Sequence, residues 1–179
     1  NLRNSELVAS FLIEHGVDPD KPDKFGQYPL KYLIENDLES AAIVLIRSGK
    51  VDLNRKFTLI ENNFIVSDSK NATYLHLAAC KFSSKILSEL LDQDVIDINC
   101  KDENEETPLV KAIKYKSIDN IKLLFSMDNL DYKYKINDNY DIIEVAKSVV
   151  EYRRNDELHL ESKEDYLEYI IHIIEAGKY

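Results

Sequence analysis

The sequence predicts an all-α solenoid in which short helix-turn-helix units stack side by side and β-hairpins connect them. One motif carries most of this prediction: Thr73–Ala79 (TYLHLAA) is echoed 34 positions later by Thr107–Ile113 (TPLVKAI). An upstream copy is Tyr28–Ile34 (YPLKYLI), and a weaker copy, Asp141–Ala146, follows a further 34 positions downstream. Self-similarity at this period is typical of stacked helical repeats, each burying its apolar face against its neighbours.

Helix boundaries follow from proline and glycine. Pro29 and Pro108 mark the first turn of a helix, where a missing N–H loses nothing. Gly16 and Gly49, 33 positions apart, each follow an apolar helix and suit the left-handed residue that ends it. We therefore expect helices at Ser5–Gly16, Pro29–Glu35, Glu39–Arg47, Tyr74–Lys81, Ser84–Asp92, Pro108–Tyr115, Ile118–Ser126 and Lys163–Glu175. Asp94 and Asp128 occupy the place of the two glycines in later repeats, and we expect the same left-handed conformation there.

The motif T-x-L-H-x-A-A, together with the tails Val51–Asn54 and Asp97–Asn99, resembles the ankyrin repeat. The resemblance covers almost the whole chain and implies one ankyrin-repeat domain over residues 1–179. The expected units are a partial repeat at 1–22, repeats at 23–56, 68–101 and 102–135, a hairpin insertion at 57–67, and an elongated last repeat at 136–179. It also implies that His76 joins its threonine in hydrogen bonds that brace neighbouring repeats, so His76 has a structural role.

Composition limits the possible partners and compartment. The chain has 33 acidic and 23 basic residues, a net charge of −10, so nucleic acid is not expected as a partner. No apolar run approaches the ~20 residues that cross a bilayer, and no signal peptide opens the chain. Cys80 and Cys100 have no partner at a metal-ligand spacing, which favours a reducing compartment, cytoplasmic or nuclear.

No motif indicates catalysis, and we expect no enzyme activity, cofactor or metal. The four glycines are dispersed, so neither a P-loop nor a dinucleotide fingerprint is present. Residues 102–106 superficially resemble a calcium loop, but Ile113 stands where the twelfth-position glutamate would be. Asn54 and Asn99 match asparagines hydroxylated in some ankyrin proteins, but the role that we expect for them is hairpin hydrogen bonding.

The function implied by the resemblance is therefore protein binding through a concave surface of hairpin tips and first helices. Carrying the family's variable positions across, and adding the apolar insertion, predicts these contact residues: Phe25, Gln27, Tyr32, Glu35, Phe57, Leu59, Phe64, Lys70, Cys80, Lys81, Lys111, Lys114 and Tyr115. The alternative is a regulatory or substrate-recruiting domain of a larger enzyme, channel, ligase adaptor or chromatin regulator, of which this chain would be a fragment.

Two apolar segments have open interpretations. The insertion after the first full repeat contains Phe57, Leu59 and Phe64, although a disposable loop is usually polar. It either offers a strand edge to a partner peptide or folds back to complete packing. In the last helix, Tyr166, Tyr169 and Ile173 widen the apolar arc and suggest self-association.

Overall fold

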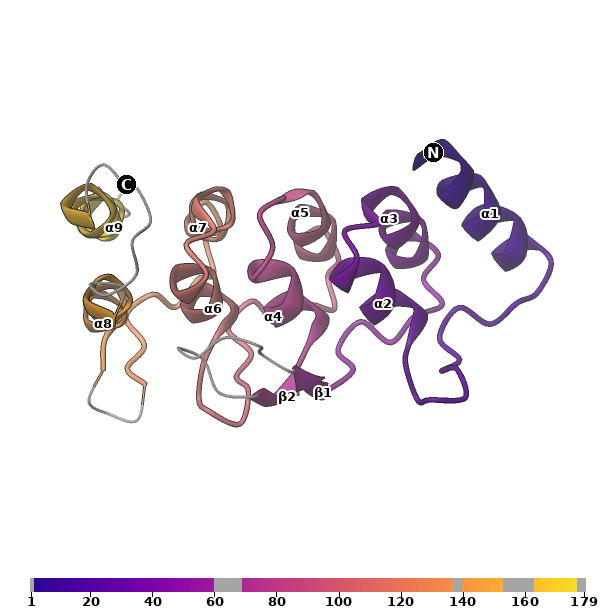
Figure 1. Ribbon diagram of the computed structural model, residues 1–179, viewed down its shortest axis with the longest axis horizontal. Helices are drawn as coiled ribbons and strands as arrows, with labels where there is room; N and C mark the ends of the chain where they lie inside the picture. The colour runs from indigo at the N-terminus through magenta and orange to yellow at the C-terminus, as the bar shows by residue number, and fades with distance from the viewer. Residues whose placement is uncertain (1, 60–68, 137–139, 153–162, 177–179) are drawn as a thin grey trace.

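The computed structural model describes residues 2–59, 69–136, 140–152 and 163–176 and shows two parallel rows of helices (Figure 1). The first row contains the first helix of each repeat. The second row contains the second helix of each repeat, including the single helix of the partial repeat. The first row is α2 (Pro29–Glu35), α4 (Tyr74–Ala79), α6 (Pro108–Lys114) and α8 (Ile142–Tyr152). The second row is α1 (Leu2–Glu14), α3 (Glu39–Arg47), α5 (Lys85–Leu91), α7 (Ile118–Phe125) and α9 (Lys163–Ala176). The predicted all-α ankyrin solenoid is confirmed.

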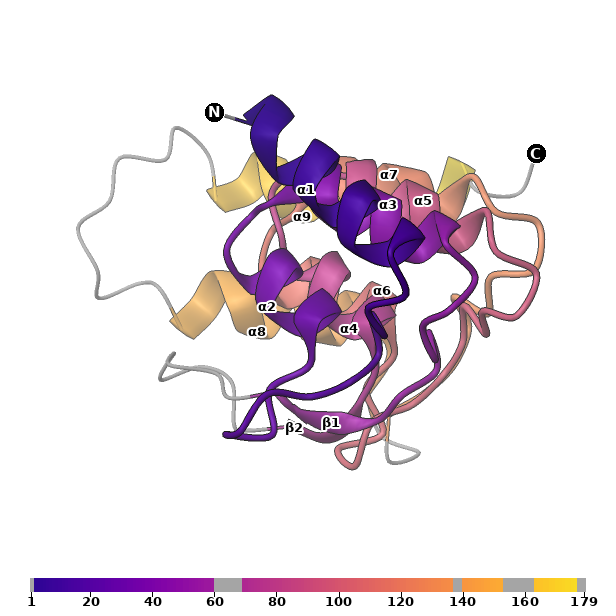
Figure 2. The same ribbon diagram turned by 90° about the vertical axis from the view of Figure 1, so that its right-hand side faces the viewer.

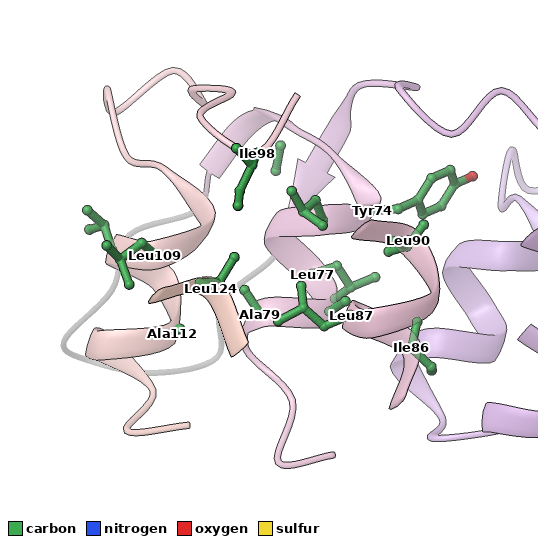
Figure 3. Close-up of a cluster of buried hydrophobic side chains, with 14 of the residues drawn as sticks. Tyr74, Leu77, Ala79, Ile86, Leu87, Leu90, Ile98, Leu109, Ala112 and Leu124 are labelled. Carbon is green, nitrogen blue, oxygen red and sulfur yellow. The ribbon is translucent and has the colours of Figure 1, made fainter. Parts of the chain in front are cut away.

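The core is a seam that runs the length of the stack. Figure 3 shows side chains of this core from two neighbouring units, among them Leu90 of α5, Leu109 of α6 and Leu124 of α7. All three are buried, and they belong to one continuous cluster that extends from Leu30 to Ile170. Each unit is therefore stabilised mainly by its two neighbours, as expected for a solenoid.

One hairpin is built as a two-stranded sheet. Strand β1 (Phe57–Leu59) pairs antiparallel with β2 (Ser69–Ala72), with Phe57 opposite Ala72 and Leu59 opposite Ser69. The hairpins extend away from the first row on the side opposite the second row, so the stack is L-shaped in cross-section (Figure 2). Phe64, and most of the insertion with it, lies outside the described residues.

The turns correct one expectation from the sequence. Gly16 and Gly49 have positive φ, as predicted, but Asp94 and Asp128 do not. In these later repeats the helix ends in right-handed turns, in which Gln93 N donates to Leu90 O (3.1 Å) and Met127 N donates to Leu124 O (3.1 Å).

Left-handed residues of the later repeats lie instead at the hairpin tips and, at Lys116 (φ 57°), between α6 and α7. Gly26 has φ 80°, and its equivalents Asn71 and Glu105 have φ 58° and 60°. These three positions share one tip geometry, and Asn is one of the few residues that tolerate it without glycine's freedom.

Candidate protein-binding surface

The candidate surface consists of the hairpin tips and the first helices that they adjoin. Its geometry starts at the motif Thr73–His76, which opens α4. His76 Nδ1 accepts from the Thr73 backbone N–H (3.2 Å) and lies 3.0 Å from Thr73 Oγ1, while Nε2 lies 3.0 Å from Glu106 O in the next repeat. A neutral imidazole with its proton on Nε2 satisfies both partners, because Nε2 then donates to that carbonyl. The predicted bracing role of His76 is confirmed.

The next repeat replaces the histidine network with a buried ion pair. Lys111 is fully buried, and its Nζ lies 3.1 Å from Asp102 Oδ2 and 2.9 Å from Glu106 Oε2. Asp102 also accepts from the Ser69 hydroxyl of β2 and from the Glu106 backbone N–H (2.9 Å). Burial opposes ionisation of Asp102, but these hydrogen bonds and the ammonium outweigh it and lower the pKa of its carboxyl group. One charge cluster thus joins the β-hairpin to the following repeat.

Neighbouring hairpins are held in register by further hydrogen bonds. Glu103 N donates to Lys70 O (2.8 Å) at adjacent tips. Asn54 Nδ2 donates to Val95 O (2.8 Å), and Asn99 Nδ2 donates to Asn129 O (2.8 Å). Both asparagine amides are therefore used to bridge successive repeats. The tips of the second and third full repeats are therefore held together, which is what recognition by a rigid surface requires.

The predicted contact residues divide by exposure. Those on the accessible face are Phe25, Tyr32 and Lys70, which are exposed, and Gln27, Glu35, Phe57, Cys80, Lys81, Lys114 and Tyr115, which are half-buried. Leu59 and Lys111 are buried and are withdrawn from the surface. Leu59 of β1 belongs to the hydrophobic core, whereas Lys111 pairs with the carboxylates of Asp102 and Glu106.

The error at Lys111 has a clear geometric cause. Lys111 of α6, Leu77 of α4 and Tyr32 of α2 occupy the same helical position, by the spacing of the repeated motif. This position was expected to face the concave surface, but Leu77 and Lys111 are buried inside the stack. Tyr32 is exposed because α2 is the first member of its row within the described residues. Its exposure reflects the open end of the stack.

Two lysines of the accessible face also have structural partners. Lys81 Nζ donates to Glu35 O (2.7 Å) and lies 3.2 Å from Asp37 Oδ1, linking the ends of α4 and α2 in successive repeats. Lys114 forms an ion pair with Glu106 within its own repeat. Both side chains therefore contribute to the structure of this face whether or not they contact a partner.

The insertion residues nearest the stack fold back on it. Leu59 is only 4% exposed, and the Phe57 ring lies 5.2 Å from that of Tyr74 (centroid to centroid). Lys31 Nζ lies 5.6 Å from the Phe57 ring centroid. At Phe57 and Leu59, therefore, the insertion folds back and packs on the stack and does not offer its side chains to a partner peptide.

The last helix also turns its aromatic side chains inward. Tyr166 OH donates to Ile113 O of α6 (2.7 Å), and the Tyr169 ring lies 5.6 Å from Lys122 Nζ of α7. Ile173 packs against the core. These three residues are half-buried within the stack, and self-association through them stays a prediction.

The cysteines and possible metal ligands offer no reactive centre in the described part of the chain. Burial raises the pKa of Cys100 to about 11, so its thiol stays protonated at neutral pH. Cys80 Sγ donates to His76 O (3.2 Å). Within the described ranges, no three His, Cys, Asp or Glu side chains come together as metal ligands, and no helix is long and apolar enough to span a bilayer.

Sequence reasoning missed an apolar face at the N-terminal end. Val8, Phe11 and Leu12 of α1 are all more than 40% exposed. The sequence contains the signal: alignment of α1 with α3 through Gly16 and Gly49 shows that the core positions of a second helix are apolar in α1 as well.

Comparisons with known proteins agree with this geometry. Residues 57–138 match the model of the family described as ankyrin repeats (3 copies). Over 106 residues the chain is 33% identical to inversin of Canis lupus familiaris, a match that covers 59% of this chain and 9% of inversin. The crystal structure of the ankyrin repeat protein EF0377 superposes with a TM-score of 0.68 at 20% identity, covering 98% of this chain and 77% of that one.

These comparisons show that the chain has the fold of an ankyrin-repeat solenoid. The resemblance recognised in the repeated motif is confirmed, with the family match centred on the second and third full repeats. Ankyrin repeats generally act as protein–protein interaction modules.

Proposed function

We propose that this chain is a non-enzymatic protein-binding module that recognises its partner through the hairpin tips and the accessible face of the first helices. The observation that supports this proposal most strongly is the link between the hairpin tips of the second and third full repeats. Lys70 and Glu103 are joined by a backbone hydrogen bond and by a side-chain ion pair of 3.5 Å. A preformed surface loses little conformational entropy on binding.

The residues proposed to contact the partner combine aromatic and charged side chains. Phe25 is 81% exposed at the first tip, and its ring lies 4.9 Å from Lys24 Nζ. Exposed aromatic side chains often supply the dominant contacts of an interface. The proposed surface is Phe25, Gln27, Glu35, Lys70, Cys80, Lys81, Lys114 and Tyr115.

Capture of partners on immobilised chain tests this proposal. The double variant Phe25→Ser/Lys70→Glu should lose proteins that the wild type retains from a lysate of the source cells, because two tips are altered without touching the core. Lys147→Glu, at an exposed residue of α8, is the matched charge control and should retain them. Retention of the same proteins by the tip variant would contradict the proposed surface.

A second candidate function is a regulatory or recruiting domain within a larger protein. The match to inversin favours this reading, because the matched segment is only 9% of that relative. Recovery of the complete reading frame around this sequence tests it, and absence of any further domain would contradict it. For either function we propose a reducing intracellular compartment, since neither Cys80 nor Cys100 forms a disulfide.

A further inference from the structure

We propose that Phe82, on the loop 80–84 between α4 and α5, is an aromatic anchor that inserts into an apolar pocket of a folded partner protein. Phe82 is 86% exposed, the largest exposed fraction among the large apolar side chains of the described residues. The α4–α5 unit lies between the α2–α3 and α6–α7 units (Figure 1), so this exposure does not arise at an end of the stack. The proposal rests on the protein-binding function proposed above and names one contact and the partner surface that fits it.

The neighbouring units close the same loop with backbone groups. The spacing of the repeated motif places Asp37 and Lys116 at the position of Phe82. Both are in the left-handed conformation, with φ of 55° and 57°. Beside Asp37, Leu38 N donates to Leu33 O (2.9 Å), and the loop at Lys116 has the equivalent bond of 3.0 Å. This is the Schellman hydrogen bond, which closes a helix end around a left-handed residue.

The loop 80–84 is closed instead by a side chain of the following unit. This loop is described throughout and contains no left-handed residue. Asn120 of α7 is fully buried, and its Nδ2 donates to Lys81 O (2.6 Å) and to Ala78 O and Ala79 O (both 3.1 Å). One side-chain amide therefore binds three carbonyl groups at the end of α4 and fixes the course of the loop.

Asn120 is a polar residue at a position that is apolar in the preceding units. The same register places Asn120 at Ala41 of α3 and Ile86 of α5, which are both buried. A buried amide costs stability unless its hydrogen bonds are made. The hydrogen bonds of Asn120 are made to the loop that carries Phe82, so Asn120 is a positioning residue for that loop. The ring of Phe82 is thus presented on a preorganised loop, which limits the entropy lost on binding.

Charges beside Phe82 are paired within the chain and favour an uncharged partner surface. Lys81 Nζ lies 3.2 Å from Asp37 Oδ1, and Lys85 Nζ lies 2.8 Å from Glu39 Oε2. Because these lysines already have carboxylate partners, an opposite charge on the partner gains little there. A second copy of the chain is disfavoured, since two copies with a net charge of −10 repel each other. The occupant is therefore an apolar site on a different protein.

The size and shape of the anchor indicate a pocket. A single ring that projects from a loop is convex, so the complementary surface is concave. An aromatic side chain buries about 150–250 Å², whereas a stable interface buries about 800 Å² per partner. Phe82 therefore adds to a larger contact. The recognition face proposed above supplies that contact, and its residues Cys80 and Lys81 directly precede Phe82 in the chain.

Photo-cross-linking from position 82 identifies the partner and the contacted site. The probe is p-benzoylphenylalanine in place of Phe82 in the whole chain, irradiated in a lysate of the source cells. Mass spectrometry of the cross-linked peptides should place the attachment on apolar residues that line a pocket of a folded protein. The same probe in place of Val95, which is 63% exposed on another loop, should not attach to that protein.

Titration of the purified partner then measures the contribution of the ring. Phe82→Ser should bind at least tenfold more weakly and keep the wild-type melting temperature, because Phe82 is exposed in the free chain. Val95→Ser is the matched control and should bind as the wild type does. The ratio of the two affinities, wild type to Phe82→Ser, should be the same in about 0.15 M and about 0.5 M salt, because an apolar contact is not screened.

A double-mutant cycle separates the positioning role of Asn120 from its role in stability. Asn120→Ala lowers the melting temperature in either case, because a buried amide is lost. If Asn120 positions Phe82, Asn120→Ala should weaken binding several-fold in the wild-type chain but should have no further effect in Phe82→Ser. Independent, additive losses in affinity would contradict the positioning role.

Several results would overturn the proposal. They are equal binding by Phe82→Ser and wild type, an affinity ratio that disappears in high salt, and cross-links from position 82 to a second copy of the chain. The tip variant Phe25→Ser/Lys70→Glu distinguishes this failure from failure of the proposed function, because it leaves the loop 80–84 unaltered. Loss of capture by the tip variant alone would overturn the anchor and support the tip surface, whereas full capture by both variants would overturn both.

Discussion

His76 couples the stability of the stack to pH. Burial lowers the pKa of His76 below its usual value of 6.5, although the Glu106 carbonyl and nearby carboxylates partly oppose this. The unfolded chain therefore takes up a proton at His76 below about pH 6.5 while the folded chain does not. Stability contributed by neutral His76 is present above pH 6.5 and is lost as the pH falls toward the folded-state pKa.

The first prediction is that His76→Gln flattens this dependence. Urea unfolding of the wild type between pH 7.5 and about pH 5 should show stability falling by up to about 1.4 kcal/mol per pH unit below 6.5. His76→Gln should lose stability at pH 7.5 but should vary less with pH. His15→Gln, at an exposed residue, is the control. Parallel pH profiles for wild type and His76→Gln would contradict the assignment.

Lys111 yields the second prediction, also at the residue scale. Lys111→Met keeps the volume but leaves Asp102 buried without its ammonium partner, and we expect a loss of about 3 kcal/mol. Asp102→Asn added to Lys111→Met should recover part of that loss. Urea unfolding followed by circular dichroism measures both, with Lys147→Met as a surface control. A loss below about 0.5 kcal/mol, typical of a surface site, would show that the buried pair is not needed.

At the scale of the element, the β1–β2 hairpin acts as a cover for the stack. The third prediction is that Leu59→Ala lowers the free energy of unfolding by about 2–4 kcal/mol, because Leu59 is almost fully buried. Thr58→Ala, at the exposed neighbour, should change it little. If Leu59→Ala leaves stability unchanged but abolishes partner capture, this part of the insertion serves recognition instead.

The helices were predictable because their boundaries have local causes. Pro29 and Pro108 begin α2 and α6, and the expected bounds of α3 were reproduced, because capping and apolar periodicity depend on neighbouring residues. The burial of Lys111 was not predictable, since equivalent positions differ only in whether another repeat covers them. Tyr32 and Lys111 share a register but not an environment, and only the assembled stack shows this.

Over the described residues the molecule is a row of units that each pack on their neighbours. At the last of them, Tyr166 of α9 donates to the Ile113 carbonyl of α6. The N-terminal end leaves Val8 and Leu12 of α1 exposed. In a solenoid the end units are stabilised by one neighbour only, so their surfaces are the natural places for a further contact.

The central claim is that the hairpin tips and first helices form the recognition face of this solenoid. Hydrogen exchange of the chain, free and saturated with a captured partner, tests this claim most directly. The account predicts slower exchange in segments 24–36, 69–81 and 103–115, which contain the tips and α2, α4 and α6, with α5 and α7 unchanged. Slower exchange confined to the second-row helices α3, α5 and α7 would contradict it.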